Sequence, residues 1–271
     1  MKFSLLLCTY AKDNPAHLKA CLVSIISQTS LPSELVIVKD GPLVPELDGA
    51  ISSTSFPFEA QTVSLPLNQT LGLARAAGVE AAKHDIIALM DSDDIALPDR
   101  FELQLAEFAK KPQISILGGQ IAEFNDNPDH THAMRMTPLA HHDIVARAKT
   151  GNPFNAMTVM FKKQAALDAG NFRYFPGFED YDLWVRMIKG GAICQNCPET
   201  LVLARTGSGM YGRRRGIGYM KQEWRMQREL FKLGLINRSR LLLNTFKRIP
   251  VRLLPNPMLE SIYIKFLRSK I

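Results

Sequence analysis

The first half of the chain alternates short apolar runs with segments of helical periodicity, and this alternation restricts the fold more than any other feature. Apolar runs predict strands at residues 3–8, 34–38, 61–65, 86–90 and 114–118. Strands separated by helices form parallel sheets that carry helices on both faces. We therefore predict an α/β fold built on a Rossmann-like, doubly wound, mostly parallel sheet.

Helix signals fill the spaces between these strands. Asn14 is a predicted N-cap, Pro15 follows at the first helical position, and apolar residues recur on one face up to Ile26. Residues 71–82 form a second helical pattern. Beyond residue 119 we predict a polar loop at 125–137, helices at 142–149 and 179–189, a β-like run at 156–162, and two short strands around Ile193 and Val202.

Charge is distributed unevenly along the 271 residues. Arg205–Ile271 contains 16 of the 33 Lys and Arg residues but 3 of the 26 Asp and Glu residues. We predict a catalytic domain at 1–205, with a nucleotide-binding half at 1–120 and an acceptor half at 121–205, followed by a helical basic C-terminal extension at 206–271. Such a charge excess favours an anionic partner, although a solvated basic face is the alternative.

The end of the extension predicts a basic amphipathic helix, because apolar residues recur at helical spacing beside Lys265, Arg268 and Lys270. This helix either lies on an anionic membrane surface or packs back on the domain. Nucleic acid is not an expected partner, since no binding module accompanies the charge. The opening apolar run is too short for a signal peptide, so we predict a cytoplasmic protein, peripheral on the inner face of the cell membrane.

Polar residues follow three of the predicted strands, and ligands of doubly wound sheets bind at such carboxyl ends. The first strand ends in Cys8, Thr9 and Tyr10, and the second in Asp40 and Gly41. Tyr10 is a candidate to pack on a nucleotide base and Asp40 to accept a hydrogen bond from it. A half-buried tyrosine and an ordinary Asp-Gly turn are the alternatives.

The fourth strand runs into Asp91, Ser92, Asp93 and Asp94, where three carboxylates repel one another unless a cation compensates them. Oxygen ligands of this kind suit Mn²⁺ or Mg²⁺, which can bridge the phosphates of a nucleotide-sugar. Asp91 and Asp93 are the predicted metal ligands. The alternative is that one aspartate caps the helix beginning near Pro98 and the others are solvated.

Three further groups are candidates on weaker patterns. Arg75 reaches a phosphate or is solvated on its helix. Asp180, in the first turn of the 179–189 helix, is a predicted general base, with Glu179 and Trp184 on the acceptor side; acids favoured by the helix dipole are the alternative. The glycine- and arginine-rich loop at 205–216 either closes over a diphosphate through Arg213, Arg214 and Arg215 or is simply solvated.

Several of these segments, taken in order, resemble the inverting family 2 glycosyltransferases with the GT-A fold: 5–10, 24–29, 34–41, 86–100 and 179–184. Residues 39–42 and 209–214 are similar to enzymes that build bacterial exopolysaccharide or O-antigen units on a lipid diphosphate, of the amylovoran-biosynthesis type. The resemblance implies a nucleotide site at Cys8, Thr9, Tyr10 and Asp40. It also implies a D-x-D pair, with Asp93 on the metal, and Asp180 as base. Cys8 and Lys39 depart from the family's usual proline and aspartate.

The resemblance implies transfer of a sugar, with inversion, from a UDP-sugar to a hydroxyl of a lipid-diphosphate-linked saccharide. A nucleotidyltransferase is one alternative, but that class carries a glycine-rich loop after its first strand, and residues 9–15 contain no glycine. A catalytically inactive peripheral membrane adaptor is the other. The presence of both Asp93 and Asp180 disfavours it.

Overall fold

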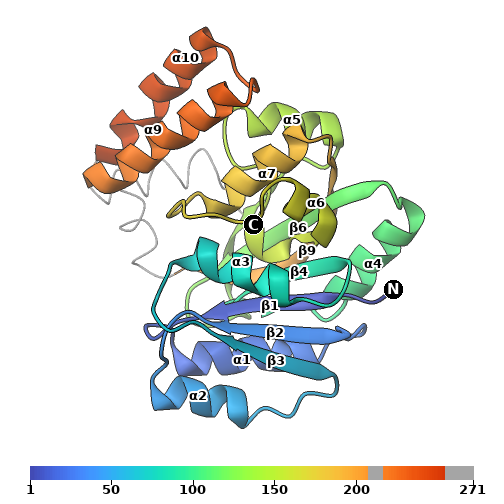
Figure 1. Cartoon of the computed structure of the whole chain (residues 1–271). Helices are drawn as coiled ribbons and strands as arrows, with labels where there is room; N and C mark the ends of the chain where they lie inside the picture. The colour runs from blue at the N-terminus through green and yellow to red at the C-terminus, as the bar shows by residue number, and fades with distance from the viewer. Residues whose placement is uncertain (207–215, 254–271) are drawn as a thin grey trace.

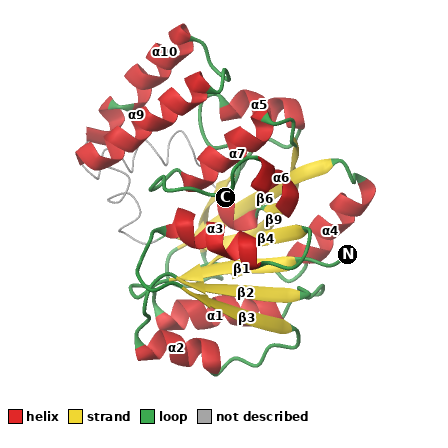
Figure 2. Ribbon diagram, viewed as in Figure 1, coloured by secondary structure: helices red, strands yellow, loops and turns green. Residues whose placement is uncertain are grey.

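The computed structural model describes residues 1–206 and 216–253, which fold around one nine-stranded sheet (Figures 1 and 2). The first half contributes β1 (Ser4–Thr9), β2 (Glu34–Lys39), β3 (Glu59–Ser64) and β4 (Ile86–Asp91). These four strands are parallel, with β1 between β2 and β4 and with β3 beside β2. The predicted α/β fold is confirmed. The strand order reverses between β1 and β4, where doubly wound sheets bind ligands.

The second half completes the sheet with antiparallel as well as parallel pairs. Its strands are β5 (Ile95–Ala96), β6 (Ile114–Phe124), β7 (Thr131–Arg135), β8 (Met160–Lys162) and β9 (Ile193–Arg205). β8 lies antiparallel between β4 and β6, and β9 runs parallel to β6. The sheet order is β3-β2-β1-β4-β8-β6-β9-β5, with β7 paired to β6.

Two predictions for this half were wrong. Residues 125–137 are not all loop, because β7 forms antiparallel pairs with β6 there. The two short strands predicted around Ile193 and Val202 are one strand, β9. Pro198 and polar neighbours interrupt its apolar pattern, and the register shift opposite Gly118 and Gln120 accommodates them within the strand.

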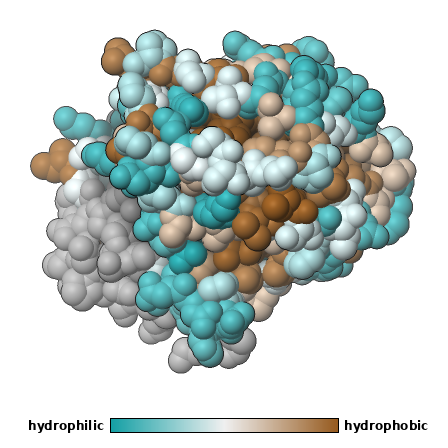
Figure 3. Space-filling view, turned by 90° about the horizontal axis from the view of Figure 1, so that it is seen from below, coloured by the Kyte–Doolittle hydropathy of each residue, from teal (hydrophilic) through white to brown (hydrophobic). Residues whose placement is uncertain are grey.

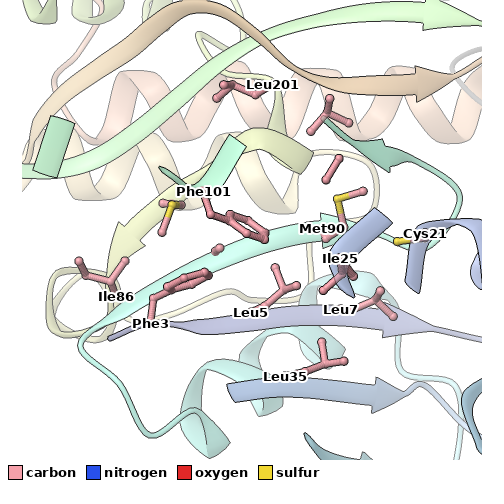
Figure 4. Packing of buried hydrophobic residues seen from close by; sticks show 14 of the residues in the cluster. Phe3, Leu5, Leu7, Cys21, Ile25, Leu35, Ile86, Met90, Phe101 and Leu201 are labelled. Carbon is pink, nitrogen blue, oxygen red and sulfur yellow. The ribbon is translucent and has the colours of Figure 1, made fainter. Parts of the chain in front are cut away.

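Helices cover both faces of the sheet, as Figure 2 shows. On one face lie α1 (Pro15–Ile26), α2 (Pro45–Ser52) and α4 (Arg100–Lys110), which contribute to one buried cluster. Phe3, directly before β1, and Phe101 of α4 meet in it, with ring centroids 5.0 Å apart (Figure 4). The predicted start of α1 is confirmed, since the Asn14 side chain accepts hydrogen bonds from the amides of Ala16 and His17.

The opposite face carries α3 (Leu71–Ala81), α6 (Lys163–Asp168) and α7 (Glu179–Lys189), which form a second buried cluster. Gly78 brings α3 close to the sheet. A Cβ at this position would lie 2.2 Å from Leu6 Cδ1 and 2.9 Å from Val38 Cγ2. The position of α3 relative to β1 and β2 therefore depends on the absence of a side chain here.

The connection between β7 and β8 contains α5 (His141–Ala148) and a 3-10 turn at Ala156–Thr158. After β9, helices α9 (Gly216–Lys232) and α10 (Arg238–Arg248) and a 3-10 turn at Pro250–Leu253 pack beside α7 and α5 (Figure 1). Met226 and Leu230 of α9 are buried against Tyr181 and Val185 of α7. This part of the basic extension is therefore integrated with the rest of the fold. The predicted amphipathic helix near the C-terminus lies outside the described residues.

The surface of the molecule mixes polar and apolar residues. On the face seen from below in the view of Figure 1, hydrophobic residues gather toward the centre and hydrophilic residues surround them (Figure 3). No helix in the described ranges combines the length and apolar character that a bilayer crossing requires.

Substituting Gly78→Ala should destabilise the protein by about 1–3 kcal/mol, because the new methyl group overlaps Leu6 and Val38. Gly49→Ala is the matched control. Gly49 lies in α2, where a Cβ would have no neighbouring atom within 4 Å, and the same change there should stabilise the helix by about 0.5–1 kcal/mol. Urea denaturation of both variants measures the two effects, and equal midpoints would contradict the close packing of α3.

Candidate active site

A cavity of about 1700 Å³ opens at the carboxyl ends of β1, β2 and β4. Pockets for a single small ligand usually measure about 300–1,000 Å³, so this cavity has room for two substrates. It brings together most of the residues predicted from the sequence: Cys8, Thr9, Tyr10, Asp40, Arg75, Asp91, Ser92, Asp93, Glu179 and Asp180.

Arg75 and Asp91 form an ion pair at the switch point of the sheet. Arg75 Nη2 lies 2.7 Å from Asp91 Oδ1, and the arginine is 3% exposed. Burial by itself would lower the pKa of Arg75, but the carboxylates of Asp91, Glu179 and Asp180 raise it overall. The alternative that Arg75 is solvated on the surface of α3 was therefore wrong.

The other aspartates of this turn differ in exposure. Asp94 is 2% exposed and accepts a hydrogen bond of 2.8 Å from the Arg205 amide, which fixes the end of β9 to the turn. Burial, reinforced by the nearby Asp93 and Asp91 carboxylates, raises the pKa of Asp94 well above its usual value. Asp93 is exposed at the cavity wall.

None of these aspartates caps the next helix. α4 begins at Arg100, and Asp99 at its N-cap position accepts no side-chain cap bond. The alternative in which one aspartate caps that helix and the others are solvated is therefore wrong for Asp91 and Asp94.

The carboxylates of this turn fit a divalent ion that binds together with a phosphate-containing substrate. Within the described residues, no three His, Cys, Asp or Glu side chains converge to hold a metal by themselves. Mg²⁺, however, commonly binds through one or two carboxylates together with substrate phosphates and water. Of the three aspartates in this turn, Asp93 is exposed at the cavity wall, Asp91 is half-buried beside Arg75, and Asp94 is buried.

One side of the cavity is formed by the ends of β1 and β2, where the sequence predicts a nucleotide site. Asp40 is held in place by hydrogen bonds from Asn68 Nδ2 at 3.0 Å and from the Gln69 amide at 2.6 Å. Gly41 has φ +87, and a Cβ there would lie 2.8 Å from the Asn68 nitrogen, so the turn requires glycine. Tyr10 is 40% exposed and offers a ring face to the cavity.

Asp13 lies beside these groups and was not among the predicted site residues. Its Oδ2 accepts hydrogen bonds from Ser92 Oγ at 2.7 Å and from the Tyr10 amide at 3.2 Å. Burial raises the pKa of Asp13. Burial also raises the pKa of the Cys8 thiol to about 12, so Cys8 contributes a neutral group to the cavity wall.

Asp180, the predicted base, lies in the first turn of α7 and lines the cavity. Its Oδ2 accepts a hydrogen bond of 2.8 Å from Asn152 Nδ2, and its Oδ1 one of 2.7 Å from the Tyr181 amide. Both bonds fix the orientation of the carboxylate toward the cavity that it lines. The next carboxylate, Glu179, is 8% exposed. Burial and the neighbouring Asp180 raise the pKa of Glu179 to about 7, while Arg75 opposes the shift.

Trp184 does not lie on the acceptor side, and this prediction needs correction. Its side chain is fully buried and packs edge-on against Phe154, Phe161 and Phe172. Residues 180 and 184 lie on nearly the same side of α7, but Trp184 is one turn further along, where the helix packs on the aromatic side chains of the second buried cluster. Trp184 therefore belongs to the core.

The predicted lid residues Arg213, Arg214 and Arg215 lie outside the described part of the chain. A different basic wall is formed by Arg147 of α5, by Lys247 and Arg248 of α10, and by Arg252 of the 3-10 turn that follows. The cavity thus has aspartates at the strand ends and arginines on the wall contributed by the C-terminal helices.

Comparison with known proteins decides the family. The model of glycosyl transferase family 2 matches residues 4–171. The chain belongs to glycosyl transferase family 2. It is 38% identical to an uncharacterised glycosyltransferase of Haemophilus influenzae, over 99% of this chain and all of that protein.

Two other relatives have more specific names. The amylovoran biosynthesis glycosyltransferase AmsE of Erwinia amylovora is 35% identical, over 97% of this chain and 98% of AmsE. The Escherichia coli UDP-Gal:alpha-D-GlcNAc-diphosphoundecaprenol beta-1,3-galactosyltransferase is 33% identical, over 98% of this chain and 97% of that enzyme.

The GT-A fold is confirmed by solved structures. Staphylococcus aureus TarS 1–349 in complex with UDP-GlcNAc superposes with a TM-score of 0.67 at 14% identity, covering 98% of this chain and 73% of TarS. Family membership identifies this chain as a glycosyltransferase, which removes the nucleotidyltransferase alternative.

Some residues of the site had weak or absent sequence signals. Asp13 lies in the loop directly after the first strand, where an acidic residue was recognisable as a candidate. Thr70, which also lines the cavity, has φ +87 and a buried hydroxyl without a hydrogen-bond partner among the described residues. Nothing in the local sequence indicates that backbone conformation. Asn152 is recognisable only from its contact with Asp180.

Replacing Glu179 by Gln should change how stability depends on pH. Because folding raises the pKa of Glu179 from 4.5 to about 7, its stabilising contribution is complete below pH 4.5 and is lost as the pH rises through 7. The free energy of unfolding of Glu179→Gln, measured relative to that of the wild type, should therefore be higher at pH 8 than at pH 5. Urea denaturation at both values, without metal, measures this difference. Exposed Glu80→Gln is the control, and an identical pH response of the two variants would contradict the assignment.

Proposed function

We propose that this chain transfers a sugar, with inversion, from a UDP-sugar to a hydroxyl of a lipid-diphosphate-linked saccharide in bacterial surface polysaccharide biosynthesis. One observation carries the proposal: an exposed carboxylate, Asp93, and a carboxylate oriented by Asn152, Asp180, line the same cavity from different elements. The names of two relatives support the lipid-linked acceptor and the polysaccharide.

On the donor side, Tyr10 would pack on the nucleotide base and Asp40 would accept a hydrogen bond from it. Mn²⁺ or Mg²⁺ held by Asp93 would neutralise the charge of the departing diphosphate. Arg75 stays paired with Asp91, so its function is to hold that carboxylate in position beneath the ligand. A TarS structure with bound UDP-GlcNAc supports a UDP-sugar as donor.

On the acceptor side, Asp180 would act as the general base. The acceptor hydroxyl oxygen attacks the anomeric carbon from the face opposite the diphosphate, and its proton passes to the Asp180 carboxylate. The bond between the anomeric carbon and the diphosphate oxygen breaks with its electron pair on the diphosphate. Attack from the opposite face inverts the anomeric configuration, as in inverting glycosidases. The Asn152 bond keeps Asp180 oriented for this step.

The proposed location of the reaction is a membrane surface. Within the part of the chain that the structure describes, α10 is the helix that would contact this surface. Leu242 and Phe246 lie one turn apart on α10 and are 68% and 79% exposed. The helix also carries four Lys and Arg residues and no acidic residue. Exposed apolar side chains among basic ones are typical of helices that lie in the interface of an anionic membrane. The C-terminal tail would add to this contact.

Two variants separate donor binding from transfer. Asp180→Asn should still be stabilised by UDP with Mn²⁺, by roughly 2.7 kcal/mol at 100 times the dissociation constant. Its transfer rate, with UDP-sugars on a lipid-diphosphate saccharide, should fall about 10²–10⁴-fold. Asp93→Ala should lose both the metal-dependent stabilisation and transfer. Exposed Asp129→Asn is the control. Undiminished transfer by Asp180→Asn would refute the assignment of Asp180 as the general base. A wild-type protein that binds UDP but transfers no sugar would favour the alternative of a catalytically inactive membrane adaptor.

The double change Leu242→Ser and Phe246→Ser should weaken binding to vesicles that contain phosphatidylglycerol by about tenfold or more, because two large apolar side chains lose their burial in the interface. Leu67→Ser, also at a highly exposed leucine, should leave binding unchanged. Cosedimentation with anionic and with neutral vesicles provides the measurement. Equal binding of the double variant and the wild type would show that α10 does not contact the membrane.

A further inference from the structure

Two arginines of the basic wall approach the same point from different helices. Arg147 lies in the last turn of α5, and Arg248 is the last residue of α10; both line the cavity. A Cβ at Gly151 would lie 3.4 Å from Arg248 Nη1 and 3.6 Å from Arg147 Nη2. The two guanidinium groups therefore flank one glycine, where no side chain separates them from each other.

Glu223 is the acidic partner of Arg248, and it also pairs with Arg252. Arg248 Nε lies 2.6 Å from Glu223 Oε1, and Arg252 Nη2 lies 2.7 Å from Glu223 Oε2. Arg248 Nη1 also donates a hydrogen bond of 2.6 Å to the Thr150 carbonyl. Arg147 is partly buried, and none of the acidic side chains that the structure describes lies within ion-pair distance of it. Burial, together with the charge of Arg248, lowers the pKa of Arg147. An anion between the two groups would relieve this repulsion.

Short connections fix the position of Arg147 relative to Asp180, the proposed general base. The Tyr181 hydroxyl donates a hydrogen bond of 2.5 Å to the Ala148 carbonyl, which joins the end of α5 to the start of α7. Asn152, the partner of Asp180, follows Arg147 by five residues. Five residues span at most about 18 Å, so one bound molecule can contact both Arg147 and Asp180.

We propose that Arg147, together with Arg248, binds the diphosphate of the acceptor, at a site separate from the donor diphosphate. This inference rests on the proposed function for the identity of the acceptor. Guanidinium groups suit this ligand because they hold phosphate oxygens through paired, charge-assisted hydrogen bonds and need no metal. With the diphosphate held there, the saccharide attached to it extends toward Asp180 and presents its hydroxyl to the base.

The kinetic test compares two acceptors with the same saccharide and lipid, one joined through a diphosphate and one through a neutral linker. Arg147→Ala should lower the preference for the diphosphate acceptor, measured as the ratio of the two kcat/KM values, by about 10–100-fold. The KM for the UDP-sugar should stay unchanged, and Arg147→Lys should recover part of the preference. Arg228→Ala, at an exposed arginine of α9 outside the cavity, is the matched control.

A binding test does not depend on turnover. Calorimetry with inorganic pyrophosphate, in EDTA and with UDP present, should detect binding to wild type and to Arg228→Ala but not to Arg147→Ala. Stabilisation by UDP with Mn²⁺ shows that each variant is folded. The enzyme could bind pyrophosphate through Arg147 and still transfer no sugar to lipid-diphosphate acceptors. That result would refute the proposed function but support an anion site at Arg147.

Two results would overturn the inference itself. Pyrophosphate binding that survives in Arg147→Ala would show that the anion binds elsewhere. An Arg147→Ala variant that raises the KM for the UDP-sugar, or that loses activity equally with both acceptors, would assign Arg147 to the donor or to general support of the site.

Discussion

The buried guanidinium of Arg75 stands between two groups of carboxylates that would otherwise repel each other across the cavity. It pairs directly with Asp91 at the end of β4, and its pKa is also raised by Glu179 and Asp180 at the start of α7. A buried cation is costly by itself and becomes stable only with such partners. The donor and acceptor sides of the site are therefore electrostatically dependent on one side chain of α3.

The position of that side chain depends in turn on close backbone contacts. A Cβ at Gly72 would lie 2.4 Å from the Arg173 carbonyl oxygen and 3.0 Å from Glu179 Cβ. Gly72 thus sets the distance between α3 and α7, as Gly78 sets the distance between α3 and β1. Two glycines on one helix fix both boundaries of the site. Positioning by packed backbone is more rigid than positioning by long side chains, which benefits a reaction that requires aligned groups.

The sequence predicted the parts of this arrangement that local patterns determine. The apolar strands and their polar ends follow from periodicity, so β1, β2 and β4 and the aspartates after β4 were recognisable. The burial of Arg75 was not, because a helical arginine looks the same whether or not a carboxylate lies beneath it. The assignment of Trp184 to the acceptor side failed because the motif around Asp180 suggested one shared site, whereas core phenylalanines cover α7 one turn beyond Asp180. The basic wall formed by α5, α10 and the 3-10 turn depends on long-range packing that no local pattern shows.

Opposite charge at the two ends of the cavity has a consequence for the proposed reaction. The donor loses its diphosphate in every turnover, whereas the acceptor keeps its own as the growing saccharide is extended. A carboxylate such as Asp93 can hold a diphosphate only through an exchangeable metal ion, so the product of donor cleavage can leave together with that ion. Arg147 and Arg248 carry fixed charges and need no such ion. In the proposed reaction, separate ends of one cavity would thus bind two diphosphates by different chemistry, with Asp180, the proposed base, lining the same cavity.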